Sequence, residues 1–370
     1  MLRKQNERVL GVKRILCILS SLDAGGAETF IMKLYRALPP DEYQFDFVVS
    51  AEGGCYTEEV LARGGRIYAI PERTKDFPGA FRGIYTAVKE NGYDVVLKLA
   101  ENALAVADLI AAKLGGAKTL ALRSCNAPTG MSFLSSTVHK LLRTLLNAMT
   151  TVKLAPSDLA AEFMFGKHAS VHLLHNGVDR KVFCYDTESR RKIRQEFDLE
   201  GKLVVGHVGR FHEQKNHRFL LEVFQEIRKH REDAVLMLVG TGDLENEIRE
   251  RVRVMGLADA VIFTGLRFDI PQLLSAMDVF VFPSFHEGMP NTVIEAQATG
   301  LPCVIADTIT READITGLVQ YLSLESTPED WARTALSTVN AARVDTTQAF
   351  MDHGYDIESV AKELMQLLGC

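Results

Sequence analysis

Two glutamates lie eight positions apart in the last third of the chain, in the run Glu287-Gly-Met-Pro-Asn-Thr-Val-Ile-Glu295. The apolar segment 276–283 leads directly into this run and predicts a strand, and 291–299 predicts a helix. One carboxylate is therefore expected on a loop and the other on a helix, with the N–H groups of the helix start between them. Such N–H groups bind phosphate, and flanking carboxylates suit sugar hydroxyls. The arrangement predicts a nucleotide-sugar site rather than a metal or hydride site.

A second loop carries two cations, Arg210 and Lys215, after the expected strand 203–208. A guanidinium binds two oxygens at once and a lysine acts as a point charge, so together they could neutralise a diphosphate leaving group. The alternative is a solvated loop with two ordinary cations. A third loop, 240–242, begins like a dinucleotide fingerprint, but Glu245 stands where the last glycine belongs. The fingerprint therefore fails.

Two further patterns carry less weight. Gly25 and Gly26 follow the first expected strand and precede a helix, where they allow close backbone approach, although any such turn can use glycine. His212 and His217 resemble a zinc-binding helix motif with one residue too many. The extra residue moves the second imidazole off the face that zinc needs, so no protein-bound metal is expected.

Short apolar segments alternate with helical ones over 14–123 and again over 203–306. This alternation indicates βαβ units and parallel sheets buried on both faces. We expect an α/β protein with two doubly wound Rossmann-like domains facing a deep interdomain cleft, which is the expected ligand site. The expected limits are 1–185 for the first domain, 186–350 for the second, and 351–370 for a C-terminal helix that crosses back to the first domain.

Composition narrows the class of protein. The chain has 370 residues, of which 47% are hydrophobic, enough for two domains with real cores. No apolar run approaches the roughly 20 residues that span a bilayer. The six cysteines form no C-x-x-C pair, so neither a disulfide framework nor a zinc knuckle is indicated. A reducing cytoplasm is the expected location.

Charge is unevenly distributed. Residues 1–185 carry 23 Lys and Arg against 18 Asp and Glu, a net of +5, and residues 186–370 carry 19 against 30, a net of −11. The imbalance is either chance variation or a first half that approaches anionic lipid or a phosphorylated acceptor. The helical segment 131–152 also allows two interpretations. It is either a core-facing helix with a basic side or a helix that lies on a membrane surface. A nucleic-acid binder would need a stronger basic excess.

Taken in order, these motifs resemble the retaining glycosyltransferases of family 4, which have the GT-B fold. The resemblance covers nearly the whole chain and is specific for the family, but far less so for sugar or acceptor. The runs 295–302 and 354–358 resemble the bacterial exopolysaccharide and capsule subgroup. The matching motifs are Gly25-Gly26-Ala-Glu28, Asn176-Gly-Val-Asp179, Gly209-Arg210 with Lys215-Asn216, and Glu287 with Glu295.

The resemblance implies a role for each matching residue. Arg210 and Lys215 would bind the donor diphosphate, and Glu287 would contact the donor sugar. The departing phosphate itself would deprotonate the acceptor hydroxyl, so no enzymic base is required. The expected donor-binding positions are Gly25, Gly26, Gly209, Gly288, Met289, Pro290, Asn291 and Glu295, the last holding the ribose hydroxyls.

One stretch departs from the family pattern. Relatives often have His-Ser-His-Asn where this chain has Arg123-Ser-Cys-Asn126. Both imidazoles are absent, which puts a histidine role near the sugar in doubt and leaves Arg123 and Asn126 as weak candidates.

The expected function is retaining transfer of a hexose-type sugar from a nucleoside-diphosphate sugar, with a UDP-sugar as the expected donor. The expected acceptor is a glycan or a lipid-linked glycan in exopolysaccharide or cell-surface polysaccharide synthesis. Two alternatives stay open: a nucleotide-sugar epimerase of the same fold and a non-catalytic nucleotide-sugar-binding scaffold. No tightly bound cofactor, no metal and no nucleic acid is expected, and peripheral contact with the inner membrane face stays open.

Overall fold

The chain folds into two compact units, seen in a computed structural model. The first unit consists of Met1–Gly177 and Ile357–Cys370, and the second of Val178–Asp356. The structure describes residues 11–23, 25–51, 53–125, 133–339 and 342–370, with the backbone alone for 133–135.

The first unit is built on a seven-stranded parallel sheet with the order β3-β2-β1-β4-β5-β6-β7. The direction of winding reverses between β1 and β4, as the doubly wound expectation requires. The strands are β1 (Lys13–Ile18), β2 (Tyr43–Val49), β3 (Ile67–Ala69), β4 (Val95–Ala100), β5 (Thr119–Ser124), β6 (Val152–Ala155) and β7 (His172–Leu173).

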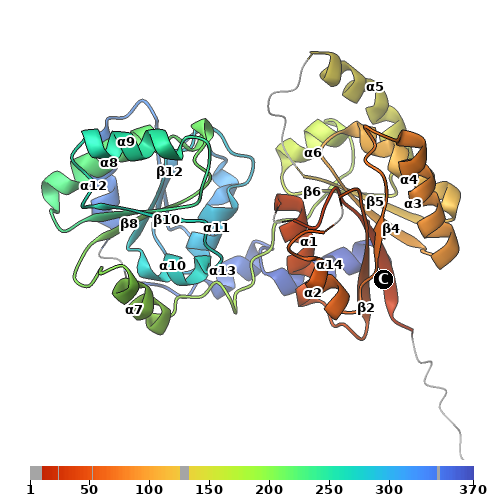
Figure 1. Cartoon of the computed structure of the whole chain (residues 1–370), viewed down its shortest axis with the longest axis horizontal. Coiled ribbons are helices and arrows are strands. Elements are labelled where there is room, and N and C mark those ends of the chain that lie inside the picture. Colours follow the sequence, from red (N-terminus) through yellow and green to blue (C-terminus); the bar gives the residue numbers. More distant parts are fainter. Residues whose placement is uncertain (1–10, 24, 52, 126–132, 340–341) are drawn as a thin grey trace, which may run out of the picture. The chain divides into compact units, whose positions relative to one another are not determined.

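Helices cover both faces of this sheet (Figure 1). Phe30 and Leu34 share one core with Leu364, and Ile84 and Leu109 share the core on the other face. The helices are α1 (Gly26–Ala37), α2 (Thr57–Ala62), α3 (Phe77–Asn91), the short η1 (Ala103–Ala105), α4 (Val106–Gly115), α5 (Phe133–Met149), α6 (Asp158–Phe165) and α14 (Ile357–Leu367).

Local signals set the ends of these helices. Asp76 accepts a hydrogen bond from the Gly79 amide, and Gly92 ends α3 with a left-handed φ of 68°. Because Asp76 caps it, α3 begins at Phe77. Ser157 is the N-cap of α6, since its hydroxyl accepts from the Ala160 amide.

The second unit has a six-stranded parallel sheet with the order β10-β9-β8-β11-β12-β13. β8 and β9 are buried along their whole length, as strands covered on both faces must be. The strands are β8 (Val204–Val208), β9 (Val235–Val239), β10 (Val261–Gly265), β11 (Val279–Phe282), β12 (Cys303–Ala306) and β13 (Val319–Leu322).

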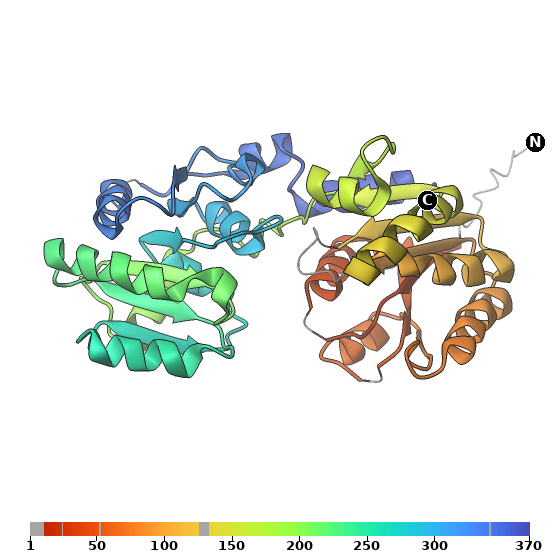
Figure 2. The ribbon, with the colours of Figure 1, turned by 90° about the horizontal axis from the view of Figure 1, so that it is seen from above.

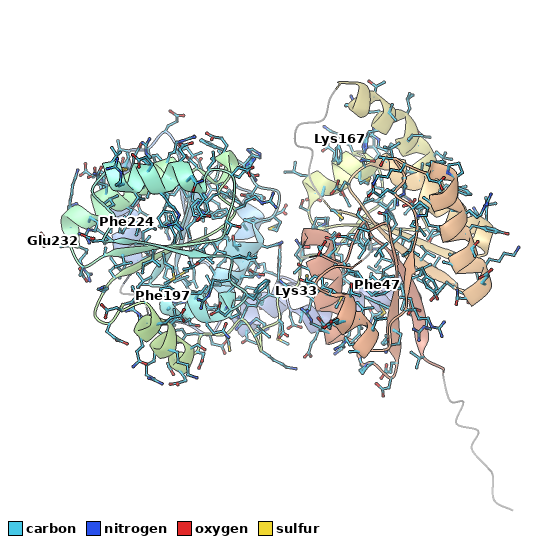
Figure 3. All side chains as sticks on the ribbon, in the orientation of Figure 1. Lys33, Phe47, Lys167, Phe197, Phe224 and Glu232 are labelled. Atoms are coloured by element: carbon cyan, nitrogen blue, oxygen red, sulfur yellow. The ribbon has the colours of Figure 1, made fainter. Side chains whose placement is uncertain are left out.

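The helices of this unit also lie on both faces of its sheet, with α8 and α9 on one face and α7 and α10 on the other (Figure 1). Figure 3 labels Phe224 on α8, and its ring is fully buried in the core. The helices are α7 (Thr187–Glu196), η2 (Glu213–Lys215), α8 (His217–His230), α9 (Glu245–Val254), α10 (Ile270–Ala276), α11 (Asn291–Ala298), η3 (Arg311–Ala313), α12 (Pro328–Thr338) and α13 (Thr347–Asp352).

The chain passes between the units twice, at 177/178 and at 356/357. The sequence placed these boundaries at 185/186 and 350/351. They differ because Phe183 and Tyr355 both pack in the core of the second unit. The predicted return of the C-terminal helix is confirmed: α14 packs against α1, and both views show its blue ribbon in the first unit (Figure 1, Figure 2).

Some elements were not predicted, among them β13 and α12. The signal for α12 lies in its cap, where Thr327 and Asp330 form a reciprocal capping box ahead of the buried Trp331. Within the described residues, none of the helices combines the length and apolar character needed to span a bilayer.

Candidate functional site

β8 and β11 are neighbours in the sheet although 70 residues separate them, and the winding of the second sheet reverses between them. Ligands of doubly wound sheets bind beyond the carboxyl ends of the strands at such a reversal. Two loops leave β8 and β11 there. They are the 209–216 loop, with both predicted cations, and the 283–290 loop, with the first predicted glutamate.

Lys215 and Glu287 meet between these two loops. Lys215 Nζ lies 2.6 Å from Glu287 Oε1, and the side chains are only 18% and 11% exposed. Ser284 Oγ donates to the same carboxylate oxygen at 2.6 Å, and Lys215 Nζ also lies 4.7 Å from the centre of the Phe282 ring. The structure therefore brings a predicted phosphate-binding cation into contact with the predicted sugar-binding carboxylate.

Gln214 and Ser284 hold the two loops together, and sequence reasoning missed both. The Gln214 carbonyl oxygen accepts from the Phe285 amide at 2.9 Å, and Gln214 Nε2 donates to the His286 carbonyl oxygen at 2.7 Å. Ser284, fully buried, has its hydroxyl 3.0 Å from the Gln214 carbonyl oxygen. Only the position of Ser284 directly after a strand and three residues before Glu287 could have indicated its role.

Arg210 lies in the 209–216 loop and differs from Lys215 in its surroundings. It is exposed, and no ion pair to it occurs among the described residues. The loop rests on the 240–242 turn, where the Phe211 amide donates to the Thr241 carbonyl oxygen at 3.1 Å. Gly240 has a φ of +132°, and a Cβ there would collide with the Gly209 carbonyl group. Glycine at 240 thus allows the two loops to stack.

α11 begins at Asn291, and its N-cap residue, Pro290, makes no side-chain capping hydrogen bond. Gly288 and Met289 lie in the loop before it, half-buried, and Glu295 lies one turn into the helix, also half-buried. The helix start therefore presents backbone N–H groups four residues after Glu287 and one turn ahead of Glu295.

Two buried histidines, His207 and His217, lie near Lys215. His207 Nδ1 is 2.9 Å from the Val281 carbonyl oxygen, so this nitrogen carries the proton. The His207 and His217 ring centres are 4.8 Å apart, and His217 also stacks on Phe211 at 4.4 Å. Neither nitrogen of His217 has a partner among the described residues. This environment favours the neutral form of both rings.

Burial, with a smaller contribution from Lys215, lowers the pKa of His217 to about 4. Burial also lowers the pKa of His207 well below its ordinary value, with His217 as the next cause. A lowered folded-state pKa means that the unfolded chain binds protons first as pH falls. The free energy of unfolding should therefore decrease between pH 6.5 and 4, by about 3 kcal/mol for His217 alone.

His217→Phe should remove the contribution of His217 to the pH dependence of the free energy of unfolding, while keeping a ring against Phe211. We expect urea unfolding at pH 7 and pH 4.5 to show a smaller pH-dependent loss for the variant than for the wild type. His207 is present in both proteins, so the difference between them reports the titration of His217 together with its effect on His207. Equal losses in both proteins would contradict a neutral, buried His217.

In the first unit, Gly25 is the N-cap of α1 and Gly26 its first residue. The Glu28 carboxylate folds back over Gly25, where a Cβ would collide with it. Burial raises the pKa of Glu28. Gly25 therefore leaves room for the Glu28 carboxylate.

Arg123 is buried at the carboxyl end of β5. Its guanidinium donates to the Leu174 carbonyl oxygen at 3.0 Å and to Asn176 Oδ1 at 2.6 Å, and lies 3.6 Å from the centre of the Phe30 ring. Burial lowers the pKa of Arg123 to about 10. Arg123 thus holds the Asn176 turn, a structural role that the sequence did not indicate, and Asn126 lies outside the described residues.

Comparisons with known proteins agree with this architecture. The model described as "Glycosyltransferase Family 4" matches residues 24–182, and "Glycosyl transferases group 1" matches residues 202–340. EpsF of Bacillus subtilis (strain 168), named as a glycosyltransferase, is 36% identical over 341 residues, which cover 90% of this chain and 89% of EpsF.

A second relative is the UDP-Gal:alpha-D-GlcNAc-diphosphoundecaprenol alpha-1,3-galactosyltransferase of Escherichia coli, 25% identical over 76% of each chain. Among solved structures, Anabaena Alr3699/HepE in complex with UDP-glucose superposes with a TM-score of 0.77 at 19% identity, covering 96% of this chain and 99% of that one. This likeness shows the GT-B fold. The chain belongs to the glycosyltransferases of family 4.

Proposed function

We propose that the second unit binds a nucleoside-diphosphate sugar at the reversal between β8 and β11. The observation that carries this proposal is the contact of Lys215 with Glu287, 2.6 Å apart. The loop that contains Lys215 also contains Arg210. A diphosphate between the two cations would have its charge neutralised, and the α11 N-terminus would donate to it. Glu287 would accept from a sugar hydroxyl, and Glu295 from the ribose.

The proposed reaction is retaining transfer of a hexose. The bond between the anomeric carbon and the phosphate oxygen breaks, and the acceptor oxygen bonds to the same carbon from the same face. The acceptor proton passes to the departing phosphate, so no side chain acts as base. Arg210 and Lys215 then stabilise the charge that develops on the leaving phosphate, which is the largest contribution this site offers.

A UDP-sugar is the proposed donor, and a glycan or lipid-linked glycan of the cell surface is the proposed acceptor. The Escherichia coli relative supports both, because its name specifies UDP-Gal and a diphosphoundecaprenol-linked acceptor. The Anabaena structure holds UDP-glucose. Cytoplasmic location and contact with the inner membrane face belong to the same proposal.

The test is incubation of the purified chain with a panel of UDP-, GDP- and ADP-sugars. A transferase releases the nucleoside diphosphate, slowly with water and faster with an acceptor. An epimerase changes the sugar but keeps it on the nucleotide, and a scaffold does neither. We expect release from one UDP-sugar, and absence of release from the whole panel would contradict the proposal.

Glu295→Ala should mainly raise the Michaelis constant for the donor. Contacts with the ribose change little between ground state and transition state, so losing them weakens binding more than turnover. A lost hydrogen bond to a charged group corresponds to an increase of about tenfold or more. Steady-state kinetics check this, and a fall in turnover at an unchanged Michaelis constant would contradict the ribose assignment.

A further inference from the structure

Tyr355 joins the 283–290 loop to one of the two connections between the units, which lie at 177/178 and 356/357. Its ring is buried in the core and meets Phe350 edge-on, with the ring centres 6.5 Å apart. Its hydroxyl lies 3.5 Å from Met289 Sδ, in the loop that precedes α11. Because burial raises the pKa of Tyr355, the hydroxyl keeps its proton. A thioether sulfur can only accept a hydrogen bond, so the hydroxyl is the donor.

The backbone of Tyr355 also holds the first connection. Its carbonyl oxygen accepts from the Val178 amide at 2.8 Å, and Val178 forms a parallel bridge with Asp356. Val178 is the first residue of the second unit and Asp356 the last, so the two connections are hydrogen-bonded to each other at the limit of that unit. Tyr355 therefore contacts the 283–290 loop through its side chain and the first connection through its backbone.

The far end of α11 is attached to the same part of the chain. The carbonyl oxygen of Ala298, the last residue of α11, accepts from Arg180 Nη1 and, at 3.2 Å, from Thr346 Oγ1. Arg180 comes two residues after Val178, and Thr346 is the N-cap of α13, which lies beside α11 (Figure 1). The Arg180 guanidinium also lies 5.1 Å from the centre of the Phe350 ring. α11 and the loop before it are thus held at both ends by the segments next to the connections.

This attachment has a consequence for ligand binding at the start of α11. Met289 belongs to the loop that would bind the donor, and it is only half-buried. Ordering a loop when a ligand binds lowers the affinity, so a contact that holds the loop in its binding arrangement beforehand raises it. Coupling between two sites is reciprocal. A bound donor should therefore stabilise in turn the contacts that hold the loop, including those of Tyr355 with the first connection.

We infer that Tyr355 is a positioning residue of the donor site, and that a bound nucleoside diphosphate stabilises the hydrogen bond between the Val178 amide and Tyr355. The inference rests on the proposed donor site between β8 and β11 and adds a residue that this proposal does not use. Tyr355 acts through Met289 and needs no contact with the donor itself.

The experiment measures hydrogen exchange of the full chain with and without saturating UDP, by mass spectrometry of short peptides that report the Val178 amide. Tyr355→Phe removes the hydroxyl and keeps the buried ring. Tyr68→Phe is the matched control, because it removes a half-buried hydroxyl of the first unit that lies 2.9 Å from the Tyr93 hydroxyl. Titration of each variant with UDP gives the dissociation constant, and thermal unfolding without ligand checks that each variant folds.

In the wild type we expect UDP to slow exchange of the Val178 amide by at least about fivefold, the lower end of typical coupling between sites. Tyr355→Phe should bind UDP about threefold more weakly, as the loss of one uncharged hydrogen bond implies, and UDP should slow its Val178 exchange less. Tyr68→Phe should match the wild type in both measurements.

The inference is overturned if UDP binds the wild type but leaves Val178 exchange unchanged. It is also overturned if Tyr355→Phe keeps either the full affinity or the full effect of UDP on exchange, or if Tyr68→Phe loses as much as Tyr355→Phe. A wild type that does not bind UDP at all would overturn the donor site itself and this inference with it, so the two failures are distinguishable.

Discussion

Lys215→Ala is expected to lower turnover by about 10²- to 10³-fold, the effect typical of removing one preorganised group that stabilises developing charge. The ammonium of Lys215 is fixed by Glu287 at 2.6 Å and lies over the Phe282 ring, so it needs little rearrangement to meet a phosphate. Arg210→Ala should have an effect of the same order, although its side chain is exposed. The measurement is release of nucleoside diphosphate at saturating donor.

The control for Lys215→Ala separates catalysis from folding. Removing the cation leaves the Glu287 carboxylate, only 11% exposed, without its partner, and this should cost some stability. Lys215→Ala/Glu287→Gln removes that unpaired charge and should recover the melting temperature without recovering turnover. Recovery of turnover in the double variant, or wild-type turnover in both single alanine variants, would contradict the diphosphate role.

Glu287→Gln should reduce turnover by about 10²-fold, while the fold survives because the side chain keeps its shape. The amide oxygen can still accept from Ser284 Oγ, but it cannot carry the charge that holds Lys215 and would bind the sugar hydroxyl. Hydrogen bonds to a charged acceptor are worth about 1.5–3 kcal/mol, and the ion pair is lost in addition. Rates with saturating donor and acceptor check this expectation.

Ser284, which contacts Glu287, offers a matched comparison for Glu287→Gln. Ser284→Ala removes one of the two groups that hold Glu287 Oε1 but keeps the charge, so it should cost far less, on the order of tenfold. If Ser284→Ala is as damaging as Glu287→Gln, the charge of Glu287 is not the property that matters. Unchanged turnover in Glu287→Gln would remove Glu287 from the site.

Much of the fold follows from the sequence because apolar strands and helices alternate so regularly. Fully buried runs such as 204–208 and 235–239 could be recognised from composition alone. β13 and α12 were missed because their segment is mostly polar and its start signal is a capping box rather than an apolar run. The boundaries differ from the expected ones by six to eight residues because the burial of Phe183 and Tyr355 in the core of the second unit cannot be read from spacing.

The candidate site, like the fold, could be predicted only in part. The loops after β8 and β11 could be assigned to one edge of a sheet. That these two loops lie side by side could not be predicted, because β8 and β11 are neighbours in the sheet but 70 residues apart in sequence. The Gln214 and Ser284 contacts depend on that pairing, and so does the Lys215–Glu287 ion pair. Arg123 could not be assigned, since its role depends on the turn at Asn176 and the ring of Phe30.

We propose that Arg210 and Lys215 bind the distal phosphate of a nucleoside diphosphate, and paired titrations of UDP and UMP measure that contact. The two ligands differ only in that phosphate, so their difference in binding free energy isolates it. We expect the wild type to bind UDP at least about tenfold more tightly than UMP, as one charged hydrogen bond implies. In Lys215→Ala that advantage should largely disappear. Equal binding of UDP and UMP by the wild type, or an advantage that Lys215→Ala retains in full, would contradict it.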